Sequence, residues 1–301
     1  MFRKIVVGYD GQDPARDALA LGRVLAGPSQ ADLTAVAVIP APVPLSTTGH
    51  FAKWQRLKRD QALAMLAEGE ASDVGHRVVE GGSPAHGLML AAEDEDADLI
   101  VVGSSHRGPA GAVLAGSTGR ALLHGTPCPV AVAPNGFRPL EEPGLRVVGV
   151  GFDGSPESQL ALRAAVELAE AAEATMRVVA VAEPSSGGPS MGFGDAELHE
   201  FEKESKRHAL DRALDSIPDE RRAAGELMTG TAALALREAA DRGMDVLVIG
   251  SRGYGPLRSV LLGSLSAEFV RSAPCPVIAF PRGAGQPAHD GVEPATARAL
   301  S

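Results

Sequence analysis

Short apolar runs alternate with longer amphipathic stretches along most of the chain. In the second half, the runs that predict strands are RVVGVGF, TMRVVAVA, a segment near AAGELMTG, DVLVIG and PVIAF. The stretches between them predict helices: SPESQLALRAAVELAEAA, DAELHEFEKESKRHALDRAL, TAALALREAADRG and a segment near SLSAEFVRSA. The order βαβαβαβαβ predicts a parallel sheet with helices on both faces. The near-continuous apolar character of the strands agrees with burial on both sides.

The sequence contains an internal repeat that covers most of the chain. Three segments of the first half return in the second: IVVGYDG as GVGFDGS, DLIVVGSS as DVLVIGSR, and TPCPVAVAP as APCPVIAFP. The offset is 143 residues between Asp10 and Asp153 but 147 residues between Gly103 and Gly250. We therefore expect four extra residues in the second copy, in the loop at 185–194.

The repeat predicts two tandem doubly wound α/β domains, each with a five-stranded parallel sheet. We place the first domain at residues 1–136, a linker rich in Pro and Gly at 137–144, and the second domain at 145–282. The tail at 283–301 has no periodicity and is predicted to be disordered. At the start of the first helix of the second domain, Ser155 is predicted as the N-cap before Pro156, and Ser158 is expected to add little.

Composition excludes several classes of function. The net charge is −10 and aromatic residues make up 4%, which disfavours a nucleic-acid-binding protein. The sequence contains no run of 18 apolar residues, so we expect no membrane span. The N-terminal apolar run is too short for a signal peptide. The two cysteines, Cys128 and Cys275, provide neither a disulfide framework nor a metal cluster. We expect a cytoplasmic protein.

The candidate chemistry lies in a glycine-rich loop after the fourth strand of each copy. GSRGYGPLRSVLLGS runs from Gly250 to Ser264, and GSSHRGPAGAVLAGS runs from Gly103 to Ser117. In open α/β sheets, ligands bind beyond the carboxyl ends of the strands. Glycine lets the backbone approach a ligand closely, and the helix that follows offers free N–H groups to a phosphate.

Each of these features has a purely structural alternative. A glycine-rich loop often only turns, and an Asp after a strand is often a helix N-cap. The loop is not a P-loop, because no Gly-Lys-Ser/Thr follows, and it is not the Rossmann fingerprint, because it follows strand four. From the spacing alone, a nucleotide site and a simple turn both remain open.

The pattern G-x2-G-x9-G-S, an Asp near the end of strand one and a closing PCPV strand resemble the universal stress protein family. The resemblance covers residues 1–134 and 145–281. It implies strand order 3-2-1-4-5, ATP binding by members that keep the glycine pattern, with Mg²⁺ held through the phosphates, and pairing through the fifth strand within or between chains. A homodimer therefore remains a candidate.

Carried over by position, the resemblance assigns nucleotide-binding residues in both copies. Asp153 matches the Asp that contacts adenine, and Val181 the residue beside the base. The full set predicted to bind nucleotide is Asp10, Val38, Gly103, His106, Gly116, Ser117, Thr118, Asp153, Val181, Gly250, Arg252, Gly253, Gly263, Ser264 and Ser266. His106 departs from the pattern, because it stands where the middle glycine belongs. It either contacts the ligand itself or fills the space and weakens binding.

Other candidates have simpler explanations. Cys128 and Cys275 are predicted to be small buried hydrophobes rather than a redox switch. His199 and His208 lie on a charged helix and are predicted to be solvated, as is the helix face at 200–207. The histidines show no spacing typical of a metal site.

The sequence predicts a binding protein rather than an enzyme. Phosphoryl transfer needs a base and a metal-holding acid, and the loop offers donors for phosphates but no convincing base. Glu268, one turn into the next helix, is a weak candidate. The main hypothesis is a nucleotide-dependent stress regulator that binds ATP. The alternatives are a slow ATPase or adenylyl-transferring relative, and an interaction module that binds no nucleotide.

Overall fold

A computed structural model describes residues 1–41, 49–105, 113, 116–126, 128–137, 144–183, 195–218, 223–250 and 273–281. The strands are β1 Lys4–Gly8, β2 Asp32–Pro40, β3 Gly75–Gly81, β4 Leu99–Gly103, β5 Val130–Ala133, β6 Val147–Gly151, β7 Thr175–Ala182, β8 Ala224–Thr229, β9 Val246–Gly250 and β10 Val277–Phe280. The helices are α1 Asp13–Ala26, η1 Gly27–Ser29, α2 Gly49–Glu68, α3 Pro84–Glu95, α4 Ser117–Gly125, α5 Pro156–Ala171, α6 Asp195–Asp215 and α7 Ala232–Asp241.

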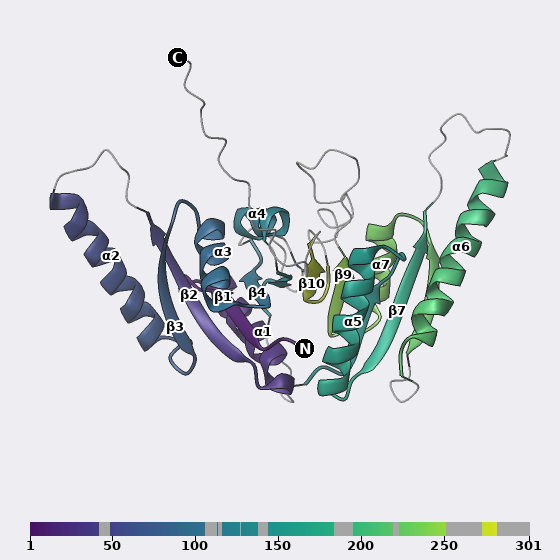
Figure 1. The fold of residues 1–301 in the computed structure, drawn as a ribbon, viewed down its shortest axis with the longest axis horizontal. Coiled ribbons are helices and arrows are strands. Elements are labelled where there is room, and N and C mark those ends of the chain that lie inside the picture. Colours follow the sequence, from purple (N-terminus) through teal and green to yellow (C-terminus); the bar gives the residue numbers. More distant parts are fainter. Residues whose placement is uncertain are drawn as a thin grey trace, which may run out of the picture.

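The strands form a single ten-stranded sheet in the order β3-β2-β1-β4-β5-β10-β9-β6-β7-β8. Each half has the order 3-2-1-4-5, and all strand pairs within a half are parallel. The predicted α/β fold and strand order are confirmed. Figure 1 shows the two halves side by side, with α2 and α6 at opposite ends of the molecule.

The joining of the two sheets into one was left open by the sequence. β5 and β10 pair antiparallel, with Val132 opposite Val277 and Ala131 opposite Ile278. The Val113 N–H adds a bond of 2.8 Å to the Ala273 carbonyl oxygen. Both fifth strands therefore lie inside the sheet, with a neighbour on each side. A homodimer would need a different surface, because neither strand has a free edge.

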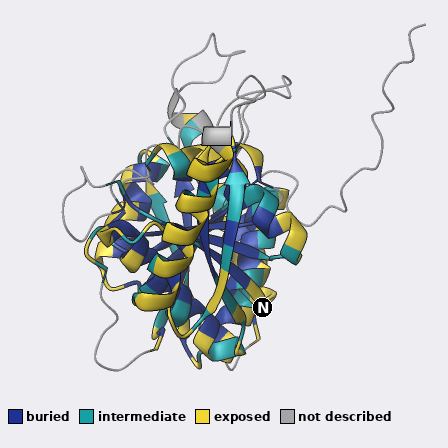
Figure 2. Cartoon of the chain, turned by 90° about the vertical axis from the view of Figure 1, so that its left-hand side faces the viewer, coloured by how far each residue is buried: buried dark blue, intermediate teal, exposed yellow. Residues whose placement is uncertain are grey.

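The core is shared between the two copies on both faces of the sheet. One cluster contains Leu19 and Leu25 of α1 together with Leu162 and Leu168 of α5. The cluster on the opposite face contains Leu88 of α3 and residues of α4 and α7. Figure 2 shows the buried strands between helices whose outer faces are exposed. Burial on both faces explains why the strand sequences are apolar almost without interruption.

A repeated aspartate ties the first strand of each half to the fourth. Asp98 stands just before β4, and its carboxylate accepts the Arg3 N–H at 2.8 Å and the Lys4 N–H at 3.2 Å. Asp245 stands just before β9 and accepts the Arg146 N–H at 2.7 Å. The Asp that recurs in DLIVVG and DVLVIG therefore accepts from backbone amides at the start of the first strand of each half.

A buried aspartate on α1 was not singled out in the sequence. Asp17 is fully buried, and its Oδ2 accepts the Gly136 N–H at 2.7 Å. This bond attaches the segment after β5 to α1. A charged side chain on the buried face of a helix is expensive unless it is paired, which is why sequence patterning does not anticipate it.

Local predictions around α5 and α6 have mixed outcomes. Ser155 caps α5 and accepts the Ser158 N–H at 3.2 Å, as predicted. The expectation for Ser158 was wrong, because its buried hydroxyl donates to the Ser155 carbonyl oxygen at 2.9 Å. His208 is exposed as predicted, but His199 is half-buried. Its Nδ1 is buried and has no partner within the described part of the chain.

Several predictions fall on residues outside the described ranges. These are the helix near 264–273, the extra residues at 185–194, most of the linker and the tail at 283–301. Among the helices that the structure describes, none is both long and apolar enough to cross a membrane.

Candidate functional site

A cleft of about 310 Å³ lies at the carboxyl ends of the strands of the first half. Its floor is formed by the ends of β1, β2 and β4, and the start of α4 closes one side. The described residues that line it are Gly8, Tyr9, Asp10, Pro14, Ala15, Val36, Val38, Pro84, Leu88, Val102, Gly103, Ser104, Ser105, Gly116, Ser117, Thr118 and Gly119. This is the switch point at which α/β sheets bind ligands.

Six of the seven residues predicted to bind nucleotide in the first copy line this cleft: Asp10, Val38, Gly103, Gly116, Ser117 and Thr118. The seventh, His106, lies outside the described residues. The structure therefore brings together residues that are up to 108 positions apart in the sequence. Their contacts with a nucleotide stay a prediction.

Asp10 has a structural role that the sequence left open. Its Oδ1 accepts the Gln12 N–H at 3.0 Å and closes the turn between β1 and α1. The residue is exposed, and Oδ2 has no hydrogen-bond partner among the described residues. One carboxylate oxygen therefore holds the turn, and the other remains for a ligand donor.

The start of α4 offers an uncapped helix end to the cleft. Gly116 is the N-cap residue, in extended conformation with φ −67° and ψ −176°, and no side chain caps the helix. The first N–H groups of a helix have no intrahelical acceptor, and its positive dipole end favours an anion by about 0.3–1 kcal/mol. Ser117 and Thr118 add hydroxyl donors at the same place.

The glycines at the ends of β4 and β9 have a packing role that the sequence did not predict. They were expected to let the backbone approach a ligand. A Cβ on Gly103 would overlap the carbonyl oxygen of Pro14, and a Cβ on Gly250 would lie 2.6 Å from Ser158 N. Each strand therefore ends against the first turn of α1 or α5, and packing alone requires glycine there.

The second half has an equivalent but narrower pocket of about 60 Å³. It is lined by Gly151, Phe152, Asp153, Ser158, Val179, Val181, Glu183, Glu202, Lys206, Ala232, Leu236, Ile249 and Gly250. Asp153, Val181 and Gly250 belong to the predicted set, and they meet here. The remaining predicted residues of this copy, Arg252, Gly253, Gly263, Ser264 and Ser266, lie outside the described residues.

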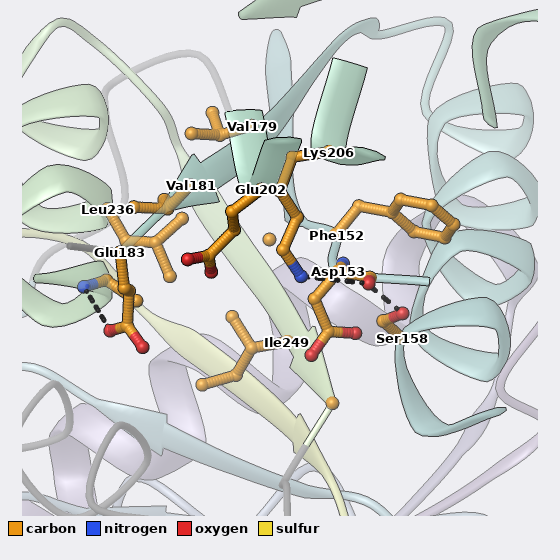
Figure 3. Close-up of a pocket in the computed structure, with 13 residues that line it drawn as sticks. Phe152, Asp153, Ser158, Val179, Val181, Glu183, Glu202, Lys206, Leu236 and Ile249 are labelled. Carbon is orange, nitrogen blue, oxygen red and sulfur yellow. Dashed lines mark hydrogen bonds between the residues drawn. The ribbon is translucent and has the colours of Figure 1, made fainter. Parts of the chain in front are cut away.

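The polar side chains of the second pocket come from α5, from α6 and from the segments that directly follow β6 and β7 (Figure 3). Asp153 accepts the Ser155 N–H at 2.8 Å, just as Asp10 accepts the Gln12 N–H at the matching turn. The Lys206 ammonium donates to the Asp153 carbonyl oxygen at 3.3 Å. Glu183 accepts the Ala232 N–H at 2.9 Å and so binds the first turn of α7.

Sequence reasoning missed Glu183, Glu202 and Lys206. Glu202 and Lys206 are four residues apart on α6, in a stretch interpreted as a solvated face. Their spacing places them on one side of the helix, which is a detectable signal. That this side faces the pocket depends on how α6 packs on β7, which no local pattern reveals.

Both cysteines are buried, as predicted, and neither forms a disulfide. Burial raises the pKa of the Cys275 thiol to about 12, and it also raises the pKa of the Cys128 thiol. Both thiols are therefore protonated near neutral pH. Because the thiolate is the reactive form, we expect neither cysteine to be reactive in the folded protein.

We expect neither thiol of the folded protein to react with Ellman's reagent near pH 8, and both to react in concentrated urea. The raised pKa of Cys275 stabilises the folded protein fully below about pH 9. This stabilisation is lost as the pH rises toward about 12, because the thiol ionises more readily in the unfolded chain than in the folded one. Absorbance at the thionitrobenzoate band measures the count. A rapid reaction of one thiol in the native state would contradict the buried assignment.

Comparison with known proteins gives a consistent result. The sequence model of the Universal stress protein family matches twice, at residues 1–134 and 144–281. A universal stress protein of Mycobacterium tuberculosis is 27% identical over 292 residues, covering 92% of this chain and 99% of the relative. A second from the same organism is 27% identical over 301 residues, covering 91% and 95%.

Solved structures agree on the fold. A universal stress protein from Archaeoglobus fulgidus superimposes with a TM-score of 0.63 at 20% identity, covering 93% of this chain and 96% of the other. A functionally unknown protein of Pseudomonas aeruginosa gives a TM-score of 0.62 at 18% identity, covering 94% and 93%. At these identities the match concerns the architecture of both halves.

Proposed function

Because the chain belongs to the universal stress protein family, with two family domains in tandem, we propose that it is a nucleotide-binding stress regulator. Each half holds one nucleotide at the carboxyl ends of its strands, and the cleft of the first half holds ATP. The protein acts in the cytoplasm, and nucleotide binding rather than turnover is its basic activity.

The observation that supports this proposal is that the first cleft has groups suited to phosphates on one side and groups suited to a base on the other. The uncapped start of α4, with Ser117 and Thr118, suits the phosphates. Across the cleft, Val38 provides an apolar surface for a base, and Oδ2 of Asp10 is an acceptor for an exocyclic amine. This arrangement separates an anion-binding end from a base-binding end, as a nucleotide requires.

Within the described residues, no group of three or more His, Cys, Asp or Glu side chains is placed to hold a metal ion. We propose that Mg²⁺ binds together with ATP, held through the phosphates of the nucleotide. The same clefts would serve a slow ATPase, which is the alternative function. An interaction module that binds no nucleotide is the third hypothesis.

The test is thermal unfolding of the full chain with and without ATP and Mg²⁺. Ligand that binds the folded state stabilises it by RT ln(1 + [L]/Kd), about 2.7 kcal/mol at a hundredfold excess over Kd. We expect the melting temperature to rise with ATP concentration, and equilibrium dialysis to detect bound nucleotide.

A matched titration with tripolyphosphate separates a nucleotide site from a general anion site, because only ATP carries the base. Absence of any ATP-dependent shift, together with no bound nucleotide in dialysis, would leave the interaction module as the better description. Release of inorganic phosphate that is lost in Gly116→Asp would favour the ATPase instead.

A further inference from the structure

The base-binding ends of the two clefts differ in their charged groups. Among the described residues that line the first cleft, Asp10 is the one carboxylate, and none of them belongs to α2. In the second half, α6 adds Glu202 and Lys206 to Asp153 and Glu183. The apolar walls remain equivalent, with Val38 and Leu88 matched by Val181 and Leu236.

Among the described residues that line this pocket, Glu202 is the carboxylate without a hydrogen bond to the rest of the fold. Asp153 and Glu183 accept backbone N–H groups at 2.8 and 2.9 Å. Half-buried Glu202 has neither a hydrogen bond nor an ion pair within the described part of the chain. Figure 3 shows its carboxylate pointing from α6 into the pocket. A carboxylate that faces apolar walls and makes no bond in the fold can accept hydrogen bonds from a ligand that enters the pocket.

Lys206 supplies the complementary donor one helical turn away. Its ammonium group also points into the pocket and donates one hydrogen bond to the Asp153 carbonyl oxygen at 3.3 Å. An ammonium group has three donors, so two remain. The pocket therefore presents a donor beside an acceptor, both from α6, next to the apolar surface of Val181 and Leu236.

Guanine has the edge that fits this pair. Its O6 is an acceptor, and its N1–H and N2–H₂ groups are adjacent donors that a single carboxylate accepts together. Adenine offers one amino group and an N1 acceptor, which would face the Glu202 carboxylate without a hydrogen atom between them. Burying an unmatched acceptor beside a carboxylate carries a cost that discriminates strongly between bases.

We propose that the second half of this chain binds a guanine nucleotide, with Glu202 accepting from N1–H and N2–H₂ and Lys206 donating to O6. This inference rests on the proposed nucleotide-binding function and refines it, since the first half keeps ATP. One chain would then carry two nucleotides that differ in their base.

The test is equilibrium dialysis of the full chain with radiolabelled GTP and ATP, each in the presence of Mg²⁺. We expect GTP to fill one site per chain, and excess ATP to displace it poorly. Glu202→Gln should weaken GTP binding about tenfold, as the loss of a bidentate base contact does. Lys206→Met should weaken it in the same direction, and both variants should leave ATP binding in the first half unchanged.

Glu204→Gln is the matched control, because Glu204 lies on the same helix, is exposed and does not line the pocket. It should bind GTP as the unmodified chain does. Filling of both sites by ATP with no GTP site, or unchanged GTP affinity in both Glu202→Gln and Lys206→Met, would overturn this inference while keeping the proposed function. Binding of neither nucleotide would overturn both.

Discussion

Gly103→Ala will lower the free energy of unfolding by about 3 kcal/mol, the upper end of the usual cost of overpacking. The added Cβ would overlap the carbonyl oxygen of Pro14, which is backbone at the first turn of α1. No side-chain rotation relieves such a contact, so α1 or the end of β4 must move. Urea denaturation, followed by circular dichroism, measures the change.

Gly27→Ala is the matched control for this substitution. No heavy atom lies within 4 Å of the position of its added Cβ, and the residue has a right-handed helical conformation with φ −50°. Alanine should be neutral there or stabilise by about 0.4–1 kcal/mol, because it restricts the unfolded chain. Equal urea midpoints for Gly103→Ala and Gly27→Ala would refute the packing explanation and return Gly103 to a purely ligand-related role.

Gly116→Asp should weaken ATP binding in the first half while leaving the protein at least as stable. The position is sterically open, since the nearest atom to an added Cβ is 3.8 Å away. Its extended backbone at the N-cap suits aspartate, which is expected to stabilise α4 by up to about 1 kcal/mol. The same carboxylate occupies the anion site and repels the phosphates.

The expected loss in ATP affinity is about 2–3 kcal/mol, which corresponds to roughly thirty- to a hundred-and-fifty-fold. Calorimetric titration gives the affinity, and a urea curve gives the stability of the same sample. Gly116→Asn is the control, because asparagine caps the helix as well but carries no charge. If Gly116→Asp binds ATP as tightly as Gly116→Asn, the start of α4 is not the phosphate site.

Much of the fold follows from local pattern in the sequence. Alternating apolar runs and amphipathic stretches predicted the parallel α/β units, and the repeat predicted two of them. Ser155 and the recurring Asp10 and Asp153 are readable because capping and turn closure act over two or three residues. The family match then supports the order of the strands and the tandem arrangement.

The candidate site was predictable only where its residues belong to a repeated motif. Val38, Gly116 and Ser117 converge as expected in the first half. Glu202 and Lys206 did not stand out, because a charged helix looks the same in sequence whether its side chains meet water or a pocket. The packing role of Gly103 also needed coordinates, since it depends on where α1 begins in space.

By itself, the amino-acid sequence determined what each segment forms, because helix and strand periodicity arise from contacts a few residues apart. Tertiary structure alone decided how the units meet. The antiparallel pairing of β5 with β10 joins residues more than 140 positions apart, and the packing of α6 places Glu202 and Lys206 in the second pocket. Such choices depend on packing between distant surfaces, which no local window of sequence contains.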